Sequence, residues 1–277
     1  MINTAIIIIV VLVSVGTFFG VVLALADKRF AMEVNPLIHE VEDILPKGQC
    51  GACGYAGCAK YAEAVVEDEN VPPNLCVPGK AAVAEKVAEL TGKKAEAAEP
   101  KYAQLKCRGT KTAAVMAARY EGIRDCAAAK LVQGGPKGCK YGCIGFGNCV
   151  RACPFGALSM GEDGLPIVDK AICTGCGKCV STCPQAILTL QSFEAPVQVE
   201  CSSHDKGPVA KKLCQNACIG CGLCMRSCER GAIKIDRFVA VVDQEICKTC
   251  DNPTCLAKCP TKAIQELVAG RMMKEVV

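Results

Sequence analysis

The first part of the chain carries its strongest hydrophobic signal. The 22 residues from Ala5 to Ala26 contain no charged side chain, and about 20 apolar residues suffice for a helix to cross a bilayer. The run ends in Ala-Leu-Ala, which imitates a signal-peptide cleavage site. However, no Lys or Arg precedes it, and Lys28 and Arg29 follow it directly. We therefore predict an uncleaved, single-pass anchor over residues 1–29 in the cytoplasmic membrane, with the C-terminal domains in the cytoplasm.

Two helical patterns and a polar stretch follow the anchor. Residues 36–45 (PLIHEVEDIL) have amphipathic helical spacing, and residues 81–90 (AAVAEKVAEL) also favour a helix. Residues 91–106 are polar and rich in Ala, Glu and Lys. We therefore predict a compact unit over residues 30–90 and a linker over residues 91–106.

The remainder of the chain contains an internal repeat. The run KGCKYGCIGFGNCVRAC, which begins at Lys137, aligns with KLCQNACIGCGLCMRSC at a constant offset of 75 residues. Such repeats indicate two copies of one supersecondary unit. Short β-rich stretches flank the cysteine runs, at residues 166–169, 186–190, 232–235 and 239–243. The pattern predicts an α+β fold with two tandem bacterial-ferredoxin-like units, over residues 107–192 (with extra cysteines) and 193–277.

Composition identifies what organises these units. The chain has 24 Cys but only 2 His, no Trp and 4% aromatic residues. A disulfide framework is typical of short secreted chains, and zinc sites often mix Cys with His. Iron–sulfur clusters instead use runs of Cys closed by Cys-Pro, and such runs recur here. Cysteine usage therefore favours [4Fe–4S] clusters over zinc or disulfides.

The cysteine spacing predicts individual ligand sets. In two-cluster ferredoxins a CxxCxxC loop supplies three ligands, and the fourth Cys of each run ligates the other cluster. Crossing the fourth cysteines in this way gives three sets: Cys173, Cys176, Cys179 and Cys153; Cys218, Cys221, Cys224 and Cys259; Cys247, Cys250, Cys255 and Cys228. The second run departs from the usual pattern because Glu229 follows Cys228 where Pro is expected.

The first run of the repeat is incomplete. Phe146 stands where Cys221 stands in the second copy, so Cys143, Cys149 and Cys183 lack a fourth ligand. The candidates are Cys139, Cys107 and Cys126, of which we take Cys139 into the ligand set. A three-iron cluster with an open corner is the alternative.

A separate one-cluster domain opens the part after the anchor. Cys50, Cys53 and Cys58 lie in a glycine-rich loop, and Cys76 follows. Glycines let the backbone wrap a cube and donate N–H groups to its sulfurs. With this set, five clusters use 20 of the 24 cysteines.

The four remaining cysteines leave a sixth cluster open. They are Cys201, Cys214 and two of the three candidates named above, which in our ligand set leaves Cys107 and Cys126. They could complete a sixth cluster between the two ferredoxin-like units. The alternatives are a regrouping, with Cys107, Cys126, Cys139 and Cys143 as one set, or ordinary buried thiols.

The charge distribution and the absence of nucleotide-binding motifs limit the functions that this chain can have. Residues 27–106 hold 10 basic and 13 acidic residues, whereas residues 107–277 hold 22 and 15. The basic balance has two interpretations, an ordinary solvated surface of mixed charge or a docking face for an acidic redox partner. The chain has no dinucleotide fingerprint after a strand and no Walker A loop, and His39 and His204 are isolated. We therefore expect no catalytic residue, no bound NAD or flavin and no nucleic-acid partner: this chain only moves electrons.

Together these motifs resemble a known family. An N-terminal anchor, CGACGYAGC at residues 50–58, CVPG at residues 76–79 and the ferredoxin repeats are similar to the B subunit of the Rnf complex. The extended run from Gly138 and the CSSHDKG stretch at residues 201–207 resemble the form found in anaerobic bacteria.

The resemblance implies an electron-transfer subunit of an ion-pumping ferredoxin:NAD oxidoreductase. Its partners would be reduced ferredoxin, integral membrane subunits and flavin-bearing subunits. One rival is a polyferredoxin of another membrane-bound hydrogenase or dehydrogenase. The other is a corrinoid methyl-transfer protein, for whose large cobamide domain the chain has no room.

Overall fold

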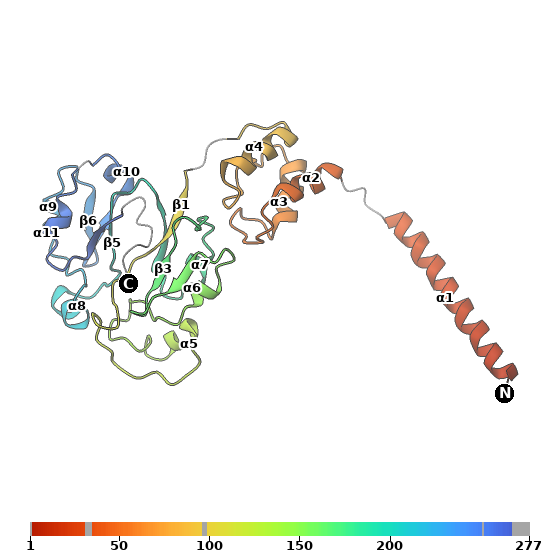
Figure 1. Cartoon of the computed structure of the whole chain (residues 1–277), viewed down its shortest axis with the longest axis horizontal. Helices are drawn as coiled ribbons and strands as arrows, with labels where there is room; N and C mark the ends of the chain where they lie inside the picture. Colours follow the sequence, from red (N-terminus) through yellow and green to blue (C-terminus); the bar gives the residue numbers. More distant parts are fainter. Residues whose placement is uncertain (1, 31–34, 96–98, 251, 268–277) are drawn as a thin grey trace.

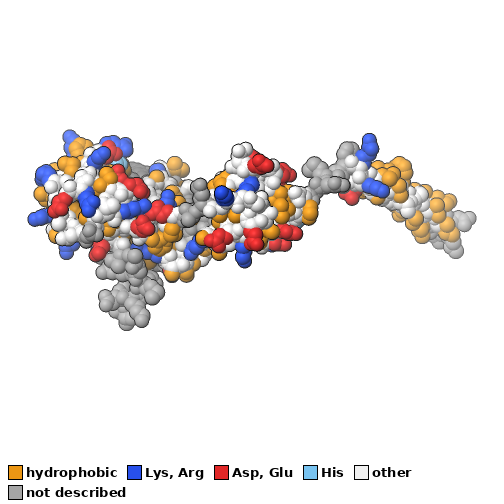
Figure 2. All heavy atoms as spheres, turned by 90° about the horizontal axis from the view of Figure 1, so that it is seen from above, with side chains coloured by type: hydrophobic (Ala, Val, Ile, Leu, Met, Phe, Trp, Pro, Cys, Tyr) orange, Lys and Arg blue, Asp and Glu red, His pale blue; other side chains and the backbone are white. Residues whose placement is uncertain are grey.

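The computed structural model describes residues 2–30, 35–95, 99–250 and 252–267. Helix α1 (Ile2–Phe30) lies by itself at one end of the molecule (Figure 1). Its stretch Ile9–Arg29 is long and apolar enough to cross a membrane. Large apolar side chains such as Leu12 and Phe18 are exposed along it, and Lys28 and Arg29 occupy its last turn (Figure 2). Because no other described element covers this surface, it is suited to an apolar environment.

Three helices form the domain that follows. They are α2 (Pro36–Ile44), α3 (Cys58–Glu67) and α4 (Lys80–Thr91), so the two helices expected from periodicity are confirmed. The Asn35 side chain accepts a hydrogen bond from the N–H of Leu37 (3.0 Å), which caps α2. Each helix buries one face against the others, and Val41, Val65 and Val87 are fully buried between them.

Two units of similar construction make up the rest of the described chain. Each combines short helices with four short strands. The first contains β1 (Lys101–Leu105), α5 (Cys126–Leu131), α6 (Asn148–Arg151), β2 (Leu158–Met160), β3 (Pro166–Val168), α7 (Lys178–Thr182) and β4 (Leu188–Ser192). The second contains β5 (Val197–Val199), α8 (Gly207–Leu213), α9 (Leu223–Arg226), β6 (Ile233–Asp236), β7 (Val239–Val242), α10 (Gln244–Cys247), α11 (Cys255–Lys258) and β8 (Ile264–Glu266). The predicted α+β repeat is confirmed.

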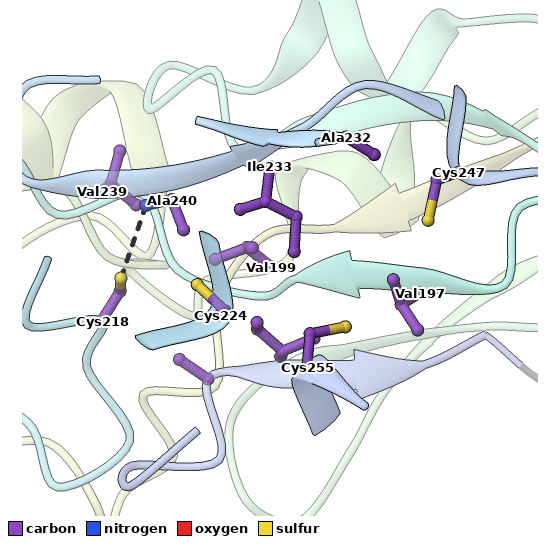
Figure 3. Packing of buried hydrophobic residues seen from close by; sticks show 12 residues of the cluster. Val197, Val199, Cys218, Cys224, Ala232, Ile233, Val239, Ala240, Cys247 and Cys255 are labelled. Atoms are coloured by element: carbon purple, nitrogen blue, oxygen red, sulfur yellow. Dashed lines mark hydrogen bonds between the residues drawn. The ribbon is translucent and has the colours of Figure 1, made fainter. Parts of the chain in front are cut away.

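Each unit holds two antiparallel strand pairs. A hairpin forms from adjacent strands, β2 with β3 and β6 with β7. The second pair joins the two ends of the unit: β1 pairs with β4, and β5 with β8. Figure 3 shows how Val197, Val199 and Ile233 fill the space between the pairs in the second unit.

The segment predicted as a linker is partly structured. Residues 101–105 form strand β1, which pairs with β4 from Lys101↔Ser192 to Leu105↔Leu188. Tyr102 and Ala103 are buried, so this strand completes the core of the first unit rather than connecting domains. The predicted boundary at residue 106 is therefore too late, because polar side chains on one face hide a half-buried strand.

Candidate iron–sulfur centres

All 24 cysteines lie within the described residues, and the fold gathers them into six groups of four. The groups are numbered here in spatial order along the molecule. Set 1 is Cys50, Cys53, Cys58 and Cys76; set 2 is Cys153, Cys173, Cys176 and Cys179; set 3 is Cys126, Cys143, Cys149 and Cys183; set 4 is Cys107, Cys139, Cys201 and Cys214; set 5 is Cys218, Cys221, Cys224 and Cys259; set 6 is Cys228, Cys247, Cys250 and Cys255.

Set 1 is built by a glycine loop that runs into α3. Gly57 precedes the helix with a φ of 145° and lets Cys58 begin it. The N–H of Cys58 donates to the Gln49 side-chain oxygen (3.0 Å), which closes the loop. Burial raises the pKa of Cys76 to about 11, and the thiolates of the other three members add to the rise. The four cysteines of set 1 therefore lie close together.

Sets 2, 5 and 6 follow the crossing pattern of the two repeats. Cys153, from the first run, lines one cavity with the three cysteines of the run that begins at Cys173. In the second unit, Cys228 joins the group of Cys247, and Cys259 joins the group of Cys224. Backbone amides approach two of these sulfurs: Ala103 N–H donates to Cys173 Sγ (3.4 Å). Ala240 N–H donates to Cys218 Sγ (3.5 Å; Figure 3).

Set 3 shows which cysteine joins the incomplete run. Cys126, at the start of α5, lines one small cavity with Cys143, Cys149 and Cys183. Asp125 caps this helix by accepting from the N–H of Ala128 (2.9 Å). The spacing had favoured Cys139 as the fourth member, with Cys107 and Cys126 as alternatives. The structure differs because residues 125–131 fold back over the run, whereas Cys139 turns towards the other unit.

Set 4 lies between the two units. Its small cavity is lined by Cys107 and Cys139 from the first unit and Cys201 and Cys214 from the second. Burial raises the pKa of Cys214, and repulsion from Cys107 and Cys139 adds to it. Three of the four cysteines left over by spacing, Cys107, Cys201 and Cys214, are thus brought to one place, and Cys139 takes the position that spacing gave to Cys126.

The cavities fit a cube better than a single ion. Among the described residues, no three His, Cys, Asp or Glu side chains are arranged to hold one metal ion. Instead, four thiols surround a hollow, which is the donor set that a [4Fe–4S] cluster uses. Burial raises the pKa of Cys143 and of Cys201 to about 12, so both are neutral thiols without a cluster. Cluster binding would therefore release protons from these thiols.

The six sets form an unbroken series. Set 1 approaches set 2, since the thiolate of Cys50 contributes to the raised pKa of Cys176 after burial. Cys149 acts likewise on Cys179, which links sets 3 and 2. These contacts run from the domain after the anchor into the first unit.

The second half of the series crosses between the units. The N–H of Cys143 donates to Cys107 Sγ (3.3 Å), which joins set 3 to set 4. Cys218 lies beside Cys201 and joins set 4 to set 5. Burial is the main cause of the raised pKa of Cys201, and the nearby Cys218 thiolate raises this pKa further. Sets 5 and 6 share one unit and exchange their fourth cysteines. Every set therefore has a direct neighbour in the series.

Fold and cysteine arrangement define a class, the multicluster [4Fe–4S] electron-transfer proteins. Family models agree: an Fe-S cluster domain matches residues 45–78, and 4Fe-4S dicluster domains match residues 142–188 and 217–263.

Whole-chain relatives identify the family. The B subunit of the proton-translocating ferredoxin:NAD(+) oxidoreductase complex of Clostridium ljungdahlii is 58% identical over 99% of this chain and 96% of its own length. The B subunit of an ion-translocating oxidoreductase complex of Methanosarcina acetivorans is 43% identical over 93% and 96%. A Na(+)-translocating counterpart of Acetobacterium woodii is 40% identical over 95% and 78%. The chain belongs to the family of B subunits of these ion-translocating oxidoreductase complexes, and the predicted resemblance is confirmed.

It follows that the chain is an electron-transfer subunit of a multi-subunit oxidoreductase complex and is associated with a membrane. The expectation of several [4Fe–4S] clusters is confirmed by the matched domains.

Proposed function

We propose that this chain relays electrons from reduced ferredoxin, through six [4Fe–4S] clusters held by sets 1 to 6, to membrane partners of an ion-pumping ferredoxin:NAD oxidoreductase. The observation that carries the proposal is the unbroken series of cysteine sets. Electron transfer along a chain of clusters needs a nearby carrier at every step, and each set lies near at least one other set. Ferredoxin and NAD are taken from two relatives, the complexes of Clostridium ljungdahlii and Acetobacterium woodii, which are both ferredoxin:NAD(+) oxidoreductases.

The chain's own residues would hold the clusters, adjust their reduction potentials and keep water away from them. A [4Fe–4S] cluster, when bound, carries one electron at a time. The thiolates hold it, and backbone amides near the sulfurs raise its potential by stabilising the added negative charge. Cys173 and Cys218 each receive such an N–H. Buried apolar side chains around them, such as Ile187 and Ile233, keep water away.

The direction follows from the position of the anchor. Only 23 residues separate Ala26 from Cys50, so set 1 is tethered close to the membrane. The ferredoxin-like units lie farther along the chain and carry its basic excess. We therefore place residues 30–277 in the cytoplasm, where thiols stay reduced, with electrons entering at these units and leaving through set 1. Integral and flavin-bearing subunits would receive them.

A single ligand change tests the exit. Cys53→Ser should remove the cluster of set 1 and leave the distal clusters reducible by ferredoxin, while the membrane partners stay oxidised. The measurement is anaerobic reduction of the intact complex followed by electron paramagnetic resonance. Ala52→Ser, in the same loop, is the matched control. Normal ferredoxin-driven NAD reduction by Cys53→Ser, with its cluster shown to be lost, would refute the assigned exit.

A further inference from the structure

The most exposed cysteine of the described chain lies in the second unit. Of the 24 cysteines, all within described residues, only Cys221 is exposed, whereas its companions Cys218 and Cys224 are buried. A cluster held by set 5 would thus come nearest to solvent on the Cys221 side. Electron exchange between proteins falls steeply with separation, so this side is where a soluble donor gains most by docking.

The residues around Cys221 form a small surface, which we name the Cys221 face: Gly220, Cys221, Gly222, Met225, Arg226 and Phe238. A β-carbon placed on Gly222 would lie 3.3 Å from Arg226 Nη1 and 3.8 Å from Met225 Cε. A β-carbon on Gly220 would lie 2.7 Å from the Phe238 carbonyl oxygen. These contacts place the side chains of Met225 and Arg226 and the backbone of Phe238 directly beside the loop that carries Cys221.

The turn that carries Phe238 adopts an unfavourable backbone conformation. Arg237 and Phe238 have φ of 40° and 67°, in the left-handed region that glycine tolerates best. In the first unit the equivalent contact is made by Gly164, whose carbonyl oxygen lies 2.9 Å from a β-carbon placed on Gly145. The second unit thus keeps an aromatic residue, 46% exposed, where glycine suffices. Such strain persists where a side chain serves function.

The corresponding face of the first unit is covered by the chain itself. Phe146, in the place of Cys221, stacks against Tyr120 with ring centroids 5.3 Å apart. Arg151, in the place of Arg226, donates to the Phe146 carbonyl oxygen (2.8 Å). By contrast, the Arg226 guanidinium makes no ion pair or hydrogen bond within the part of the chain that the structure describes. The face of the first unit is therefore covered by side chains of the same chain, whereas the Cys221 face of the second unit is uncovered in the described part of the chain.

The charge around the open face selects the partner. Residues 201–237 contain seven basic and three acidic side chains. Lys206 adjoins the face, because a β-carbon on the next residue, Gly207, would lie 2.5 Å from the Ile219 carbonyl oxygen. Arg237 is partly offset by Asp236 at 3.6 Å. An apolar centre with a basic rim fits a small protein with an acidic rim, since complementary charge accelerates and orients encounters.

We propose that the Cys221 face is where the electron donor, a small acidic ferredoxin-type protein, docks and passes its electron to the cluster of set 5. This rests on the proposed function and adds the surface that performs it. Met225 and Phe238 provide the apolar contact, and Arg226 and Lys206 attract the acidic rim. Electrons then have set 4 as their next neighbour on the way to the membrane, and the cluster of set 6 lies beside this route rather than on it.

Binding of an oxidised donor tests the surface without electron transfer. The probe is an acidic two-cluster ferredoxin, titrated calorimetrically against the full-length, cluster-loaded chain. Phe238→Gly should weaken binding about tenfold, as for a central aromatic contact. It should leave the fold intact, because glycine suits the φ of this turn. Arg226→Gln should weaken binding about fivefold at low salt and much less at high salt.

Controls come from the first unit. Arg119→Gln and Leu131→Ala change side chains that are each 89% exposed, and both should leave Kd unchanged. Stopped-flow reduction by dithionite should be equal for all variants, while reduction by ferredoxin should slow only in the two face variants. Unchanged Kd and rate in both face variants would overturn the docking surface, as would a larger loss with Arg230→Gln beside set 6. If ferredoxin fails to reduce even the wild-type chain, the proposed function itself fails.

Discussion

The assignment of Cys126 to set 3 and Cys139 to set 4 makes a quantitative prediction. Six sets of four thiols correspond to about 24 irons per chain. Cys149→Ala and Cys139→Ala remove one ligand each from different sets, so each should lose one cluster, leaving about 20 irons. Cys126→Ala removes a ligand from the same set as Cys149→Ala, so the double variant of these two should also retain about 20 irons. The double variant Cys126→Ala and Cys139→Ala strikes two sets and should retain about 16 irons.

The assay is iron and acid-labile sulfide per chain after anaerobic purification, with electron paramagnetic resonance to detect a three-iron cluster. Ala127→Ser is the matched control, because it alters an exposed neighbour of Cys126 and no thiol. The reasoning is refuted if Cys126→Ala and Cys139→Ala together lose no more iron than either alone. That result would place both cysteines on one cluster, and the assignment of set 4 as a separate cluster site would be wrong.

Three further predictions follow from the fold. Tyr61 is 1% exposed, and its hydroxyl donates to the Pro72 carbonyl oxygen (3.0 Å). Tyr61→Phe should lower the free energy of unfolding by about 1 kcal/mol and Tyr61→Ala by about 3–5 kcal/mol, measured by chemical denaturation of the full chain. Equal losses of stability in the two variants would contradict this. Gly175 (φ 74°) would place a β-carbon 2.3 Å from the Lys101 carbonyl oxygen, whereas Gly156 (φ 65°) faces open space. Gly156→Ala should therefore cost about 1–2 kcal/mol and Gly175→Ala more, with loss of the cluster of set 2 in absorbance; a larger effect at Gly156 would argue against this backbone contact. Deleting residues 1–29 should give a protein that stays in the supernatant without detergent and keeps its cluster spectra, because the anchor holds no cysteine; lost clusters would contradict an independent anchor.

Sequence patterns predicted some of the regular elements. The helices expected around residues 36–45 and 81–90 and the β-rich stretches at residues 166–169, 186–190, 232–235 and 239–243 are present as α2, α4, β3, β4, β6 and β7, whereas β2, β5 and β8 are too short to show a local pattern. Strand β1 was missed because its partner β4 is distant in the chain and its exposed residues are polar. Nothing local shows that Tyr102 is buried by the repeat that follows.

Cysteine spacing was sufficient to predict ligand sets only where the ligands lie within one CxxCxxC run or its repeat. A CxxCxxC loop fixes three ligands locally, and the crossing of fourth cysteines follows from the repeat. Cys126 stands outside any run, so its place depends on how α5 folds back. The one available signal was Asp125, a favourable helix N-cap directly before it, which accepts from Ala128 N–H in the structure.

Set 4 couples the two units in a way that neither repeat contains alone. Two of its thiols come from each unit, and burial keeps Cys201 neutral when no cluster is bound, with its pKa raised to about 12. Binding a cluster there requires both units to be docked, and docking is stabilised in turn by the free energy of ligation. The contact between Arg108 and the Lys262 carbonyl oxygen (2.7 Å) spans the same junction. In the proposed path, a cluster at set 4 would both carry electrons between the two units and stabilise their docking, so separately expressed units would lack this cluster and the path between them.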